Sequence, residues 1–171
     1  GYGHTELGAR AHQVNGQPMA HNPALGAGVN LNDLGFGDPT RPDTNVWIDI
    51  ERGEQVHVIE RFLSVAPGDV PISTVVLGEL YVGAERSRNP GLARRTVDRL
   101  VHGFDRCGID SGTARRYAEV TADLAQRGEL IGVNDRWIAA QALAQDCVLV
   151  TANMGEFSRV RGLRLENWRF P

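Results

Sequence analysis

A single carboxylate, Glu79, interrupts a stretch of sequence that is otherwise suited to burial. Between Val70 and Ala84 no other residue carries a charge, and most are apolar or small. The stretch is too long and too rich in glycine for one strand, so it predicts a short strand followed by a helix. A buried, unpaired carboxylate is costly or becomes protonated. Glu79 therefore needs an arginine, a network of hydrogen bonds or a cation.

Three further oxygen-bearing side chains occupy comparable positions. Asp43 opens the segment DTN, Asp135 lies at the start of the helical segment NDRWIAAQAL, and Asn153 follows the apolar run CVLVT. Each one alone is an ordinary acid at a helix start or an ordinary turn residue. At the carboxyl edge of a parallel sheet, however, such residues meet. Together with Glu79 they predict a site for Mg²⁺ or Mn²⁺, which prefer oxygen ligands and can activate water against a phosphodiester.

Alternating strands and helices are expected to position these residues. Helical patterns cover residues 44–54, 56–65, 89–104, 111–128 and 134–146, and a further helix carries Glu79. Short apolar runs over 70–73, 107–110, 147–151 and 162–168 predict strands. Ser111 is a plausible N-cap, and Gly128 marks a helix end. The alternation predicts an α/β fold with a mostly parallel sheet covered by helices on both faces.

Residues 1–42 differ in composition from the rest of the chain. They hold eight of the 20 glycines and four of the eight prolines, but only five charged residues. Neither the helical nor the strand period persists there, which predicts loop or disorder. The folded domain is therefore expected to span residues 43–171.

The overall composition is typical of a soluble globular protein, with 42% hydrophobic and 23% charged residues. No apolar stretch approaches the roughly 18 residues that span a bilayer, so a cytoplasmic protein with no membrane association is expected. Cys107 and Cys147 are the only cysteines, and their separation suggests neither a disulfide framework nor a zinc site.

All 18 basic residues are arginine, and the net charge is −3. Arginine binds phosphate and carboxylate in bidentate fashion. A group of them could hold RNA locally, although codon bias in a GC-rich genome together with a solvated helix face explains it equally well. The group comprises Arg86, Arg88, Arg94, Arg95, Arg99, Arg106, Arg115 and Arg116.

Four segments, in this order, resemble the PIN-domain ribonucleases, in particular the VapC and FitB-like toxins of bacterial type II toxin–antitoxin pairs. They are DTNV (43–46), ISTVVLGELYVGAERSRNP (72–90), IGVNDRWIAAQAL (131–143) and LVTANMGEFSRVRGLRLENW (149–168). The resemblance implies a PIN-like α/β/α sandwich with a central, mostly parallel sheet. It also implies a Mg²⁺- or Mn²⁺-dependent endoribonuclease toxin that forms a homodimer and is inhibited by a cognate antitoxin.

The resemblance also assigns roles by motif position. It makes Asp43, Glu79 and Asp135 the catalytic, metal-binding acids, and Asn153 the fourth catalytic position, where many members have aspartate. Because asparagine is neutral, it lowers the negative charge of the site. Asn45 and Thr151 match residues that usually support the site through hydrogen bonds.

The chain departs from the family pattern just before Asp43, where an apolar first strand is expected. The residues there are GFGDPTRP, and Pro39 and Pro42 cannot donate to a strand ladder, so the central first strand is predicted to be missing. Codons that spell GDPTRP can, one base later, spell Val-Ile-Leu-Leu-Asp. A slipped reading frame is therefore one hypothesis for residues 1–42, and a genuine flexible extension is the other.

Two other classes of function remain open from the sequence. One is a catalytically silent PIN-like interaction protein, in which Glu79 pairs with an arginine and no metal binds. The other is a Mg²⁺-dependent phosphohydrolase that acts on small phosphate esters rather than on RNA. Metal dependence and the choice of substrate separate the three classes.

Overall fold

The computed structural model describes residues 13–14, 17–18, 39–65 and 67–171. The expectation that residues 1 to about 38 lack regular structure and pack little against the body lies largely outside the described residues. It is wrong at β1 (Gln13–Val14) and β2 (Gln17–Pro18), which form a short antiparallel pair. In the part of the chain that is described, no helix is both long and apolar enough to cross a membrane.

Strands and helices alternate from residue 40 onward, as the sequence predicts. In chain order they are β3 (Thr40–Pro42), α2 (Thr44–Arg52), α3 (Val56–Ser64), the 3₁₀ turn η2 (Pro67–Asp69), β4 (Ile72–Ser73), α4 (Thr74–Glu85), α5 (Pro90–Leu100), β5 (Arg106–Cys107), α6 (Ser111–Gln126), α7 (Val133–Ala144), β6 (Val148–Val150), α8 (Met154–Phe157) and β7 (Leu165–Glu166). The short helix α8 was not predicted. The N-cap of α6 is Asp110 rather than Ser111, because the Asp110 carboxylate accepts the backbone N–H of Thr113 at 2.7 Å.

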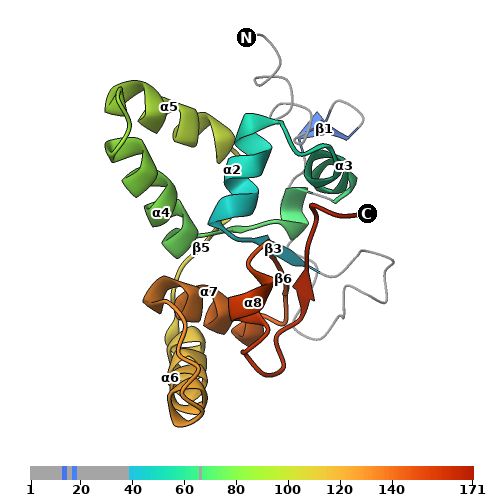
Figure 1. Ribbon diagram of the computed structural model, residues 1–171. Coiled ribbons are helices and arrows are strands. Elements are labelled where there is room, and N and C mark those ends of the chain that lie inside the picture. The colour runs from blue at the N-terminus through green and yellow to red at the C-terminus, as the bar shows by residue number, and fades with distance from the viewer. Residues whose placement is uncertain (1–12, 15–16, 19–38, 66) are drawn as a thin grey trace.

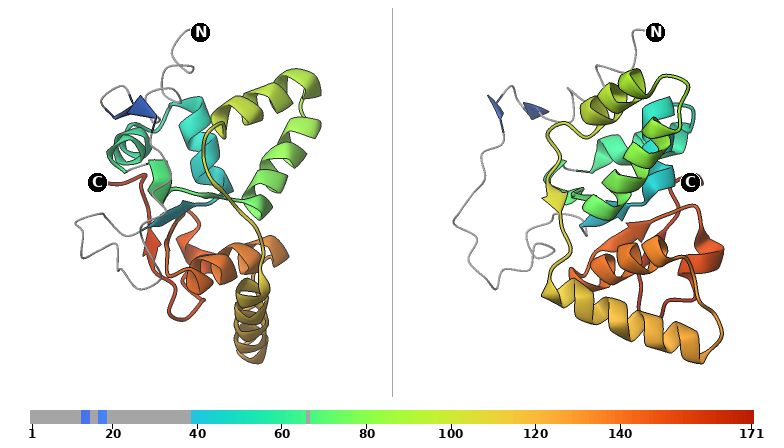
Figure 2. Two further views of the ribbon diagram at one scale, coloured as in Figure 1. Left: turned by 180° about the vertical axis from the view of Figure 1, so that it is seen from behind. Right: turned by 90° about the vertical axis from the view of Figure 1, so that its left-hand side faces the viewer.

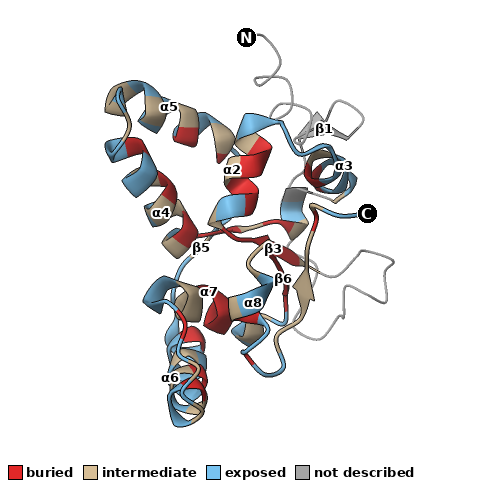
Figure 3. Cartoon of the chain, viewed as in Figure 1, coloured by how far each residue is buried: buried red, intermediate tan, exposed pale blue. Residues whose placement is uncertain are grey.

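The elements form three layers with the strands in the middle. Helices α2 to α5 lie on one side of the strands, and α6, α7 and α8 lie on the other (Figures 1 and 2). Two parallel ladders, β3-β6-β7 and β4-β5, make up the middle layer, which Figure 3 shows to be buried around β3 and β6. The fold is an α/β/α sandwich with a parallel middle layer, as predicted.

The first strand, which the sequence predicted to be missing, is present as β3. It pairs in parallel with β6, and all three of its residues are buried. The backbone N–H of Asp43 donates to Val150 and that of Val148 donates to Pro39, each at 2.9 Å. Because bonding directions alternate along a strand, the nitrogen of Pro42 points away from β6. The prediction of a missing strand was wrong because β3 is hydrogen-bonded on one side only, so the missing N–H of Pro42 is not needed. The sheet is consequently split between β3 and β4.

An aromatic cluster fixes the helices on one side of the sheet. Trp47 on α2 is fully buried, and its ring lies edge-on to Phe62 of α3 and to Phe104, at centroid distances of 5.9 and 5.1 Å. Such edge-to-face contacts stabilise beyond the area they bury. The cluster sets the position of α2, whose first turn carries part of the candidate site.

Arg41, in the middle of β3, is a buried cation that has no acidic partner among the described residues. Only 2% of the residue is exposed. Its Nη2 donates to the side chain of Gln145 and lies 3.8 Å from the sulfur of Cys147, whereas Nε and Nη1 have no hydrogen-bond partner in the same part of the chain. A buried charge that is incompletely hydrogen-bonded opposes folding.

Replacing Arg41 with leucine is expected to stabilise the protein. The change removes a desolvated charge and supplies an apolar side chain to a buried strand, which should raise the free energy of unfolding by on the order of 1 kcal/mol or more. Urea unfolding followed by circular dichroism measures the change. The matched control is Arg95→Leu on the exposed face of α5, which should change stability little. If the Arg41→Leu protein is less stable than wild type, the conclusion that the buried charge of Arg41 opposes folding is wrong.

Candidate active site

The residues predicted to converge lie around one cavity at the carboxyl edge of the strands. The cavity has a volume of about 320 Å³ and is open to solvent on one side. Its walls come from β3, α2, α4, α7, α8 and the segment after β6. The lining residues are Asp43, Thr44, Asn45, Glu79, Asp135, Ile138, Asn153 and Phe157.

Asp43 is held rigidly because it performs three structural tasks at once. It ends β3 and caps α2, where its Oδ1 accepts the backbone N–H of Val46 at 3.0 Å. Its Oδ2 accepts the Thr151 hydroxyl at 2.5 Å. Burial raises the pKa of Asp43, and the hydrogen bonds from Thr151 and the helix N-terminus oppose that rise.

Glu79 has a network of hydrogen bonds rather than an arginine. The residue is half-buried, not fully buried as expected, because α4 borders the open side of the cavity. Its Oε2 accepts the hydroxyl of Thr44, and its Oε1 accepts the Asn134 amide at 2.9 Å. These two donors supply the hydrogen bonds that a carboxylate in an apolar stretch requires.

Asp135 lies in the first turn of α7, where Gly132 leaves room for it. A Cβ built at Gly132 would lie 3.0 Å from the Asp135 carboxylate. Burial raises the pKa of Asp135 to about 6, and a hydrogen bond from protonated Asp135 to Glu156 of α8 and the charges of Glu156, Glu79 and Asp43 act in the same direction. Burial and the neighbouring negative charges therefore oppose ionisation of Asp135.

The predicted supporting residues differ in what they contact. Thr151 is buried and donates to Asp43, while it accepts the backbone N–H of Asn153 at 2.9 Å. Asn153 lines the cavity at the start of α8. Asn45 also lines it, but within the described residues its side chain makes no hydrogen bond, and only its backbone N–H interacts with Asp43. The catalytic and metal-binding roles of all these residues remain predictions.

Sequence reasoning missed three residues of the site: Thr44, Asn134 and Glu156. Thr44 and Asn134 stand next to predicted acids in the segments DTN and ND, so their proximity could have been noticed. Glu156 lies three residues after Asn153 on α8, a spacing that brings side chains to one helix face. Because the helix α8 was not predicted, the helical spacing between Asn153 and Glu156 could not be recognised from the sequence.

The site suits a divalent cation in its charge and ligand chemistry. Three carboxylates line the cavity, and Asp135 interacts with a fourth, Glu156; burial and the repulsion between these groups raise the pKa of Asp135. An added cation relieves that repulsion. Within the described residues, no group of three or more histidine, cysteine or acidic side chains is already arranged as a chelating set. Several carboxylate oxygens are instead engaged by hydroxyl, amide and backbone donors, so cation binding would exchange some of these contacts.

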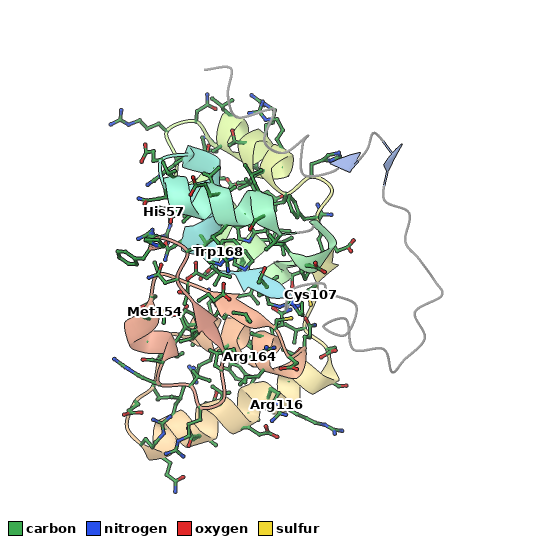
Figure 4. The ribbon with its side chains drawn as sticks, turned by 90° about the vertical axis from the view of Figure 1, so that its right-hand side faces the viewer. His57, Cys107, Arg116, Met154, Arg164 and Trp168 are labelled. Atoms are coloured by element: carbon green, nitrogen blue, oxygen red, sulfur yellow. The ribbon has the colours of Figure 1, made fainter. Side chains whose placement is uncertain are left out.

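The two cysteines lie away from this cavity. Figure 4 shows Cys107 on the opposite side of the molecule from Met154, the first residue of α8. Both cysteines are unpaired and contact Gln145, through its side-chain amide at 2.8 Å from Cys107 and its carbonyl at 3.4 Å from Cys147. Both thiols are free; Cys147 is buried and Cys107 is partly exposed.

Comparison with known proteins identifies the family. The family model described as PIN domain matches residues 42–163. The chain belongs to the PIN-domain family, as its segments and its fold both predict.

The similar proteins are mainly VapC ribonucleases. The tRNA(fMet)-specific endonuclease VapC of Shigella flexneri is 36% identical over 126 residues, which cover 74% of this chain and 95% of the relative. Among solved structures, DNA-bound VapBC from Salmonella typhimurium has a TM-score of 0.72 at 31% identity and covers 77% of this chain and 99% of that one. DNA-bound VapBC2 from Rickettsia felis has a TM-score of 0.69 at 28% identity, with coverage of 75% and 98%.

A second, shorter similarity involves an unrelated protein. A tetrathionate reductase chain of Salmonella typhimurium is 55% identical over 56 residues, which cover 33% of this chain but only 6% of the reductase. So small a share of that protein carries no inference about activity. It does indicate that part of the chain resembles something other than a PIN domain.

The raised pKa of Asp135 predicts how stability depends on pH without metal. Because the pKa of Asp135 is about 6 in the folded state and 3.8 ordinarily, the folded protein holds a proton that the unfolded chain loses between these values. The stabilisation is complete below pH 3.8 and is lost as pH rises through about 6. After allowance for solvent screening of this half-buried group, the loss is on the order of 1 kcal/mol.

Urea unfolding at several pH values between 4 and 7, with metal removed, measures this loss. Glu156→Gln should reduce the decline, because it removes the neighbouring negative charge. Glu119→Gln, which changes an exposed acid on α6, should retain the wild-type decline. Equal declines in wild type and Glu156→Gln would contradict the coupling.

Proposed function

We propose that the protein is a metal-dependent endoribonuclease, the toxin component of a toxin–antitoxin pair, that hydrolyses RNA phosphodiester bonds. The observation that carries the proposal is the gathering of Asp43, Glu79 and Asp135 around one solvent-open cavity of a PIN fold, with Glu156 next to Asp135. The names of the VapC relatives support an RNA substrate. A catalytically silent protein would not need to keep so many like charges together, since their repulsion opposes folding.

Asp43, Glu79 and Asp135 would hold Mg²⁺ or Mn²⁺, with Asn153 and Glu156 at the edge of the site. The bound cation would supply an activated water and neutralise charge on the scissile phosphate. Thr151 and the N-terminus of α2 fix Asp43 at the base of the cavity. Glu156 of α8 adds negative charge beside Asp135, which strengthens the demand for a cation.

Exposed arginines support an RNA substrate over a small phosphate ester. All eight arginines between residues 86 and 116 are exposed, and they extend from the turn between α4 and α5 to α6. Arg94 and Arg116 pair with Glu85 and Glu119 at 2.6 and 2.9 Å, and such exposed pairs are weak. These cations are available to a polyanion, and contacts of this type make binding salt-dependent.

A groove beside the site supports an antitoxin partner. It has a volume of about 530 Å³ and lies between α2, α4 and α5. Its walls are mainly apolar, and Glu79 borders both this groove and the site cavity. An apolar segment of an antitoxin could lie there and direct an arginine to the carboxylates. The lining includes Ile48, Leu80, Leu92, Val97 and Leu100. The solved VapBC neighbours are toxin–antitoxin complexes, and a homodimer acting in the cytoplasm completes the proposal.

The first test is cleavage of total RNA by the purified protein with Mg²⁺ or Mn²⁺ and with EDTA. Cleavage should require the metal, and Asp43→Asn, Glu79→Gln or Asp135→Asn should each lower the rate by about a hundredfold or more. Each variant should keep the wild-type circular dichroism spectrum. Glu119→Gln, an exposed acid outside the cavity, serves as the control and should cleave normally. Full activity in EDTA would contradict the proposal, and cleavage of a chromogenic phosphate ester without cleavage of RNA would favour a phosphohydrolase.

The second test concerns the groove. Leu92→Asp places a charge on the apolar groove wall and should weaken inhibition by the cognate antitoxin by about tenfold or more, with RNA cleavage retained. Leu63→Asp on α3 is the matched control, because both leucines are 49% exposed and only Leu92 lines the groove. Titration of antitoxin against RNA cleavage measures the difference. Equal inhibition of both variants would place the antitoxin elsewhere.

We propose further that residues 1–42 do not originate from the PIN domain and that the reading frame has slipped near GDPTRP. Two observations support this. The match to the PIN family model begins at residue 42, and within the described residues the buried Thr40 and Arg41 side chains carry polar atoms without partners. The nucleotide sequence is the direct test. A gene in which the shifted frame does not encode an apolar strand before DTN would remove the hypothesis and favour a genuine extension.

A further inference from the structure

Glu79 is held by donors from two other helices. Thr44, the first residue of α2, donates its hydroxyl to Oε2, and Asn134, the second residue of α7, donates its amide to Oε1 at 2.9 Å. Both carboxylate oxygens are therefore engaged, one from each side of the sheet layer. Through this single side chain α2, α4 and α7 are joined at the mouth of the cavity.

The sequence places both donors next to acids of the site. Asp43 caps α2, so the residue that follows it, Thr44, occupies the first turn with its side chain at the cavity. Asn134 directly precedes Asp135 in the first turn of α7. The local structure that positions each acid thus also positions a donor for Glu79.

The orientation of Glu79 matters because the residue borders two different spaces. It lines the carboxylate cavity and also the apolar groove between α2, α4 and α5. A glutamate in the middle of a helix has several rotatable bonds, and a free carboxylate could turn toward either space. Two hydrogen bonds from fixed helix starts favour the orientation toward the cavity.

We propose that Thr44 and Asn134 are positioning residues that hold the Glu79 carboxylate toward the cavity in readiness for a divalent cation. They act through Glu79 and need not touch RNA. The inference rests on the proposed metal-dependent function and assigns a role that the matched family motifs did not suggest for these two residues. Outer partners of metal-binding side chains typically change metal affinity by about ten- to a hundredfold.

The experiment compares Thr44→Val with Thr44→Ser in the full chain. Valine keeps the shape of threonine and removes the hydroxyl, whereas serine keeps the hydroxyl. Calorimetric titration with Mn²⁺ alone should show affinity about tenfold weaker for Thr44→Val and recovered in Thr44→Ser. Asn134→Ala should weaken affinity less, because this hydrogen bond is exposed to water. Thermal unfolding without metal should be similar for all variants, which separates positioning from a loss of stability.

A double-mutant cycle makes the test specific for Glu79. In a Glu79→Ala background, adding Thr44→Val should cause no further loss of Mn²⁺ affinity if Thr44 acts only through Glu79. An additive loss, or a Thr44→Val protein that binds Mn²⁺ as wild type does, would overturn the inference. So would a wild-type protein that binds no Mn²⁺.

RNA cleavage keeps this inference distinct from the proposed function. A wild type that cleaves RNA with metal, together with a Thr44→Val variant of unchanged Mn²⁺ affinity, would leave the function standing and remove the positioning role. A wild type that binds Mn²⁺ in a Thr44-dependent way but cleaves no RNA would keep the positioning role and remove the function.

Discussion

The pairing of β3 with β6 is the contact on which the rest of the site depends. It aligns Pro42 with Val150, so that the next residues of the two strands, Asp43 and Thr151, lie side by side. A backbone hydrogen bond from Asp43 to Val150 and a side-chain hydrogen bond from Thr151 to Asp43 then fix the first acid. Since Asp43 also caps α2, the same register sets the start of that helix. A one-residue change of register would move Asp43 to the other face of the sheet.

The sequence predicted the order of the elements and the convergence of four side chains, because both depend on local patterns. Apolar periodicity identified the helices, and parallel topology places residues after strand ends on one edge. What it could not predict depends on partners distant in the chain. Thr44 and Glu79 are 35 residues apart, and the pairing of Asp135 with Glu156 requires the unpredicted helix α8. The strand β3 was rejected on its prolines, although a strand bonded on one side tolerates a proline whose nitrogen faces the other.

Repulsion between neighbouring carboxylates is the second constraint on the site, and each acid is stabilised against it in a different way. Asp43 is buried and receives donors from a helix N-terminus and a threonine. Glu79 is half-buried and receives a hydroxyl and an amide. The pKa of Asp135 is raised to about 6 by burial, by its hydrogen bond to Glu156 and by the surrounding negative charges. The three acids therefore differ in how readily they can exchange their present partners for a cation, with Asp43 the most tightly held.

Strand β3 leads directly to Asp43, the most tightly held acid of the site. The side chains of β3 are nevertheless poorly matched to their buried surroundings. Thr40 and Arg41 are buried on β3 with polar atoms that lack partners in the described part of the chain, while β6 beside it is wholly apolar over Val148–Val150. The backbone hydrogen bonds of β3 do not depend on side-chain identity, which explains how TRP can occupy a position where an apolar strand is expected. Side-chain burial, however, determines how firmly the strand is held against the helices. In this chain the register that places Asp43 is therefore maintained by the backbone ladder and by the cap of α2, with little contribution from the side chains of β3 itself.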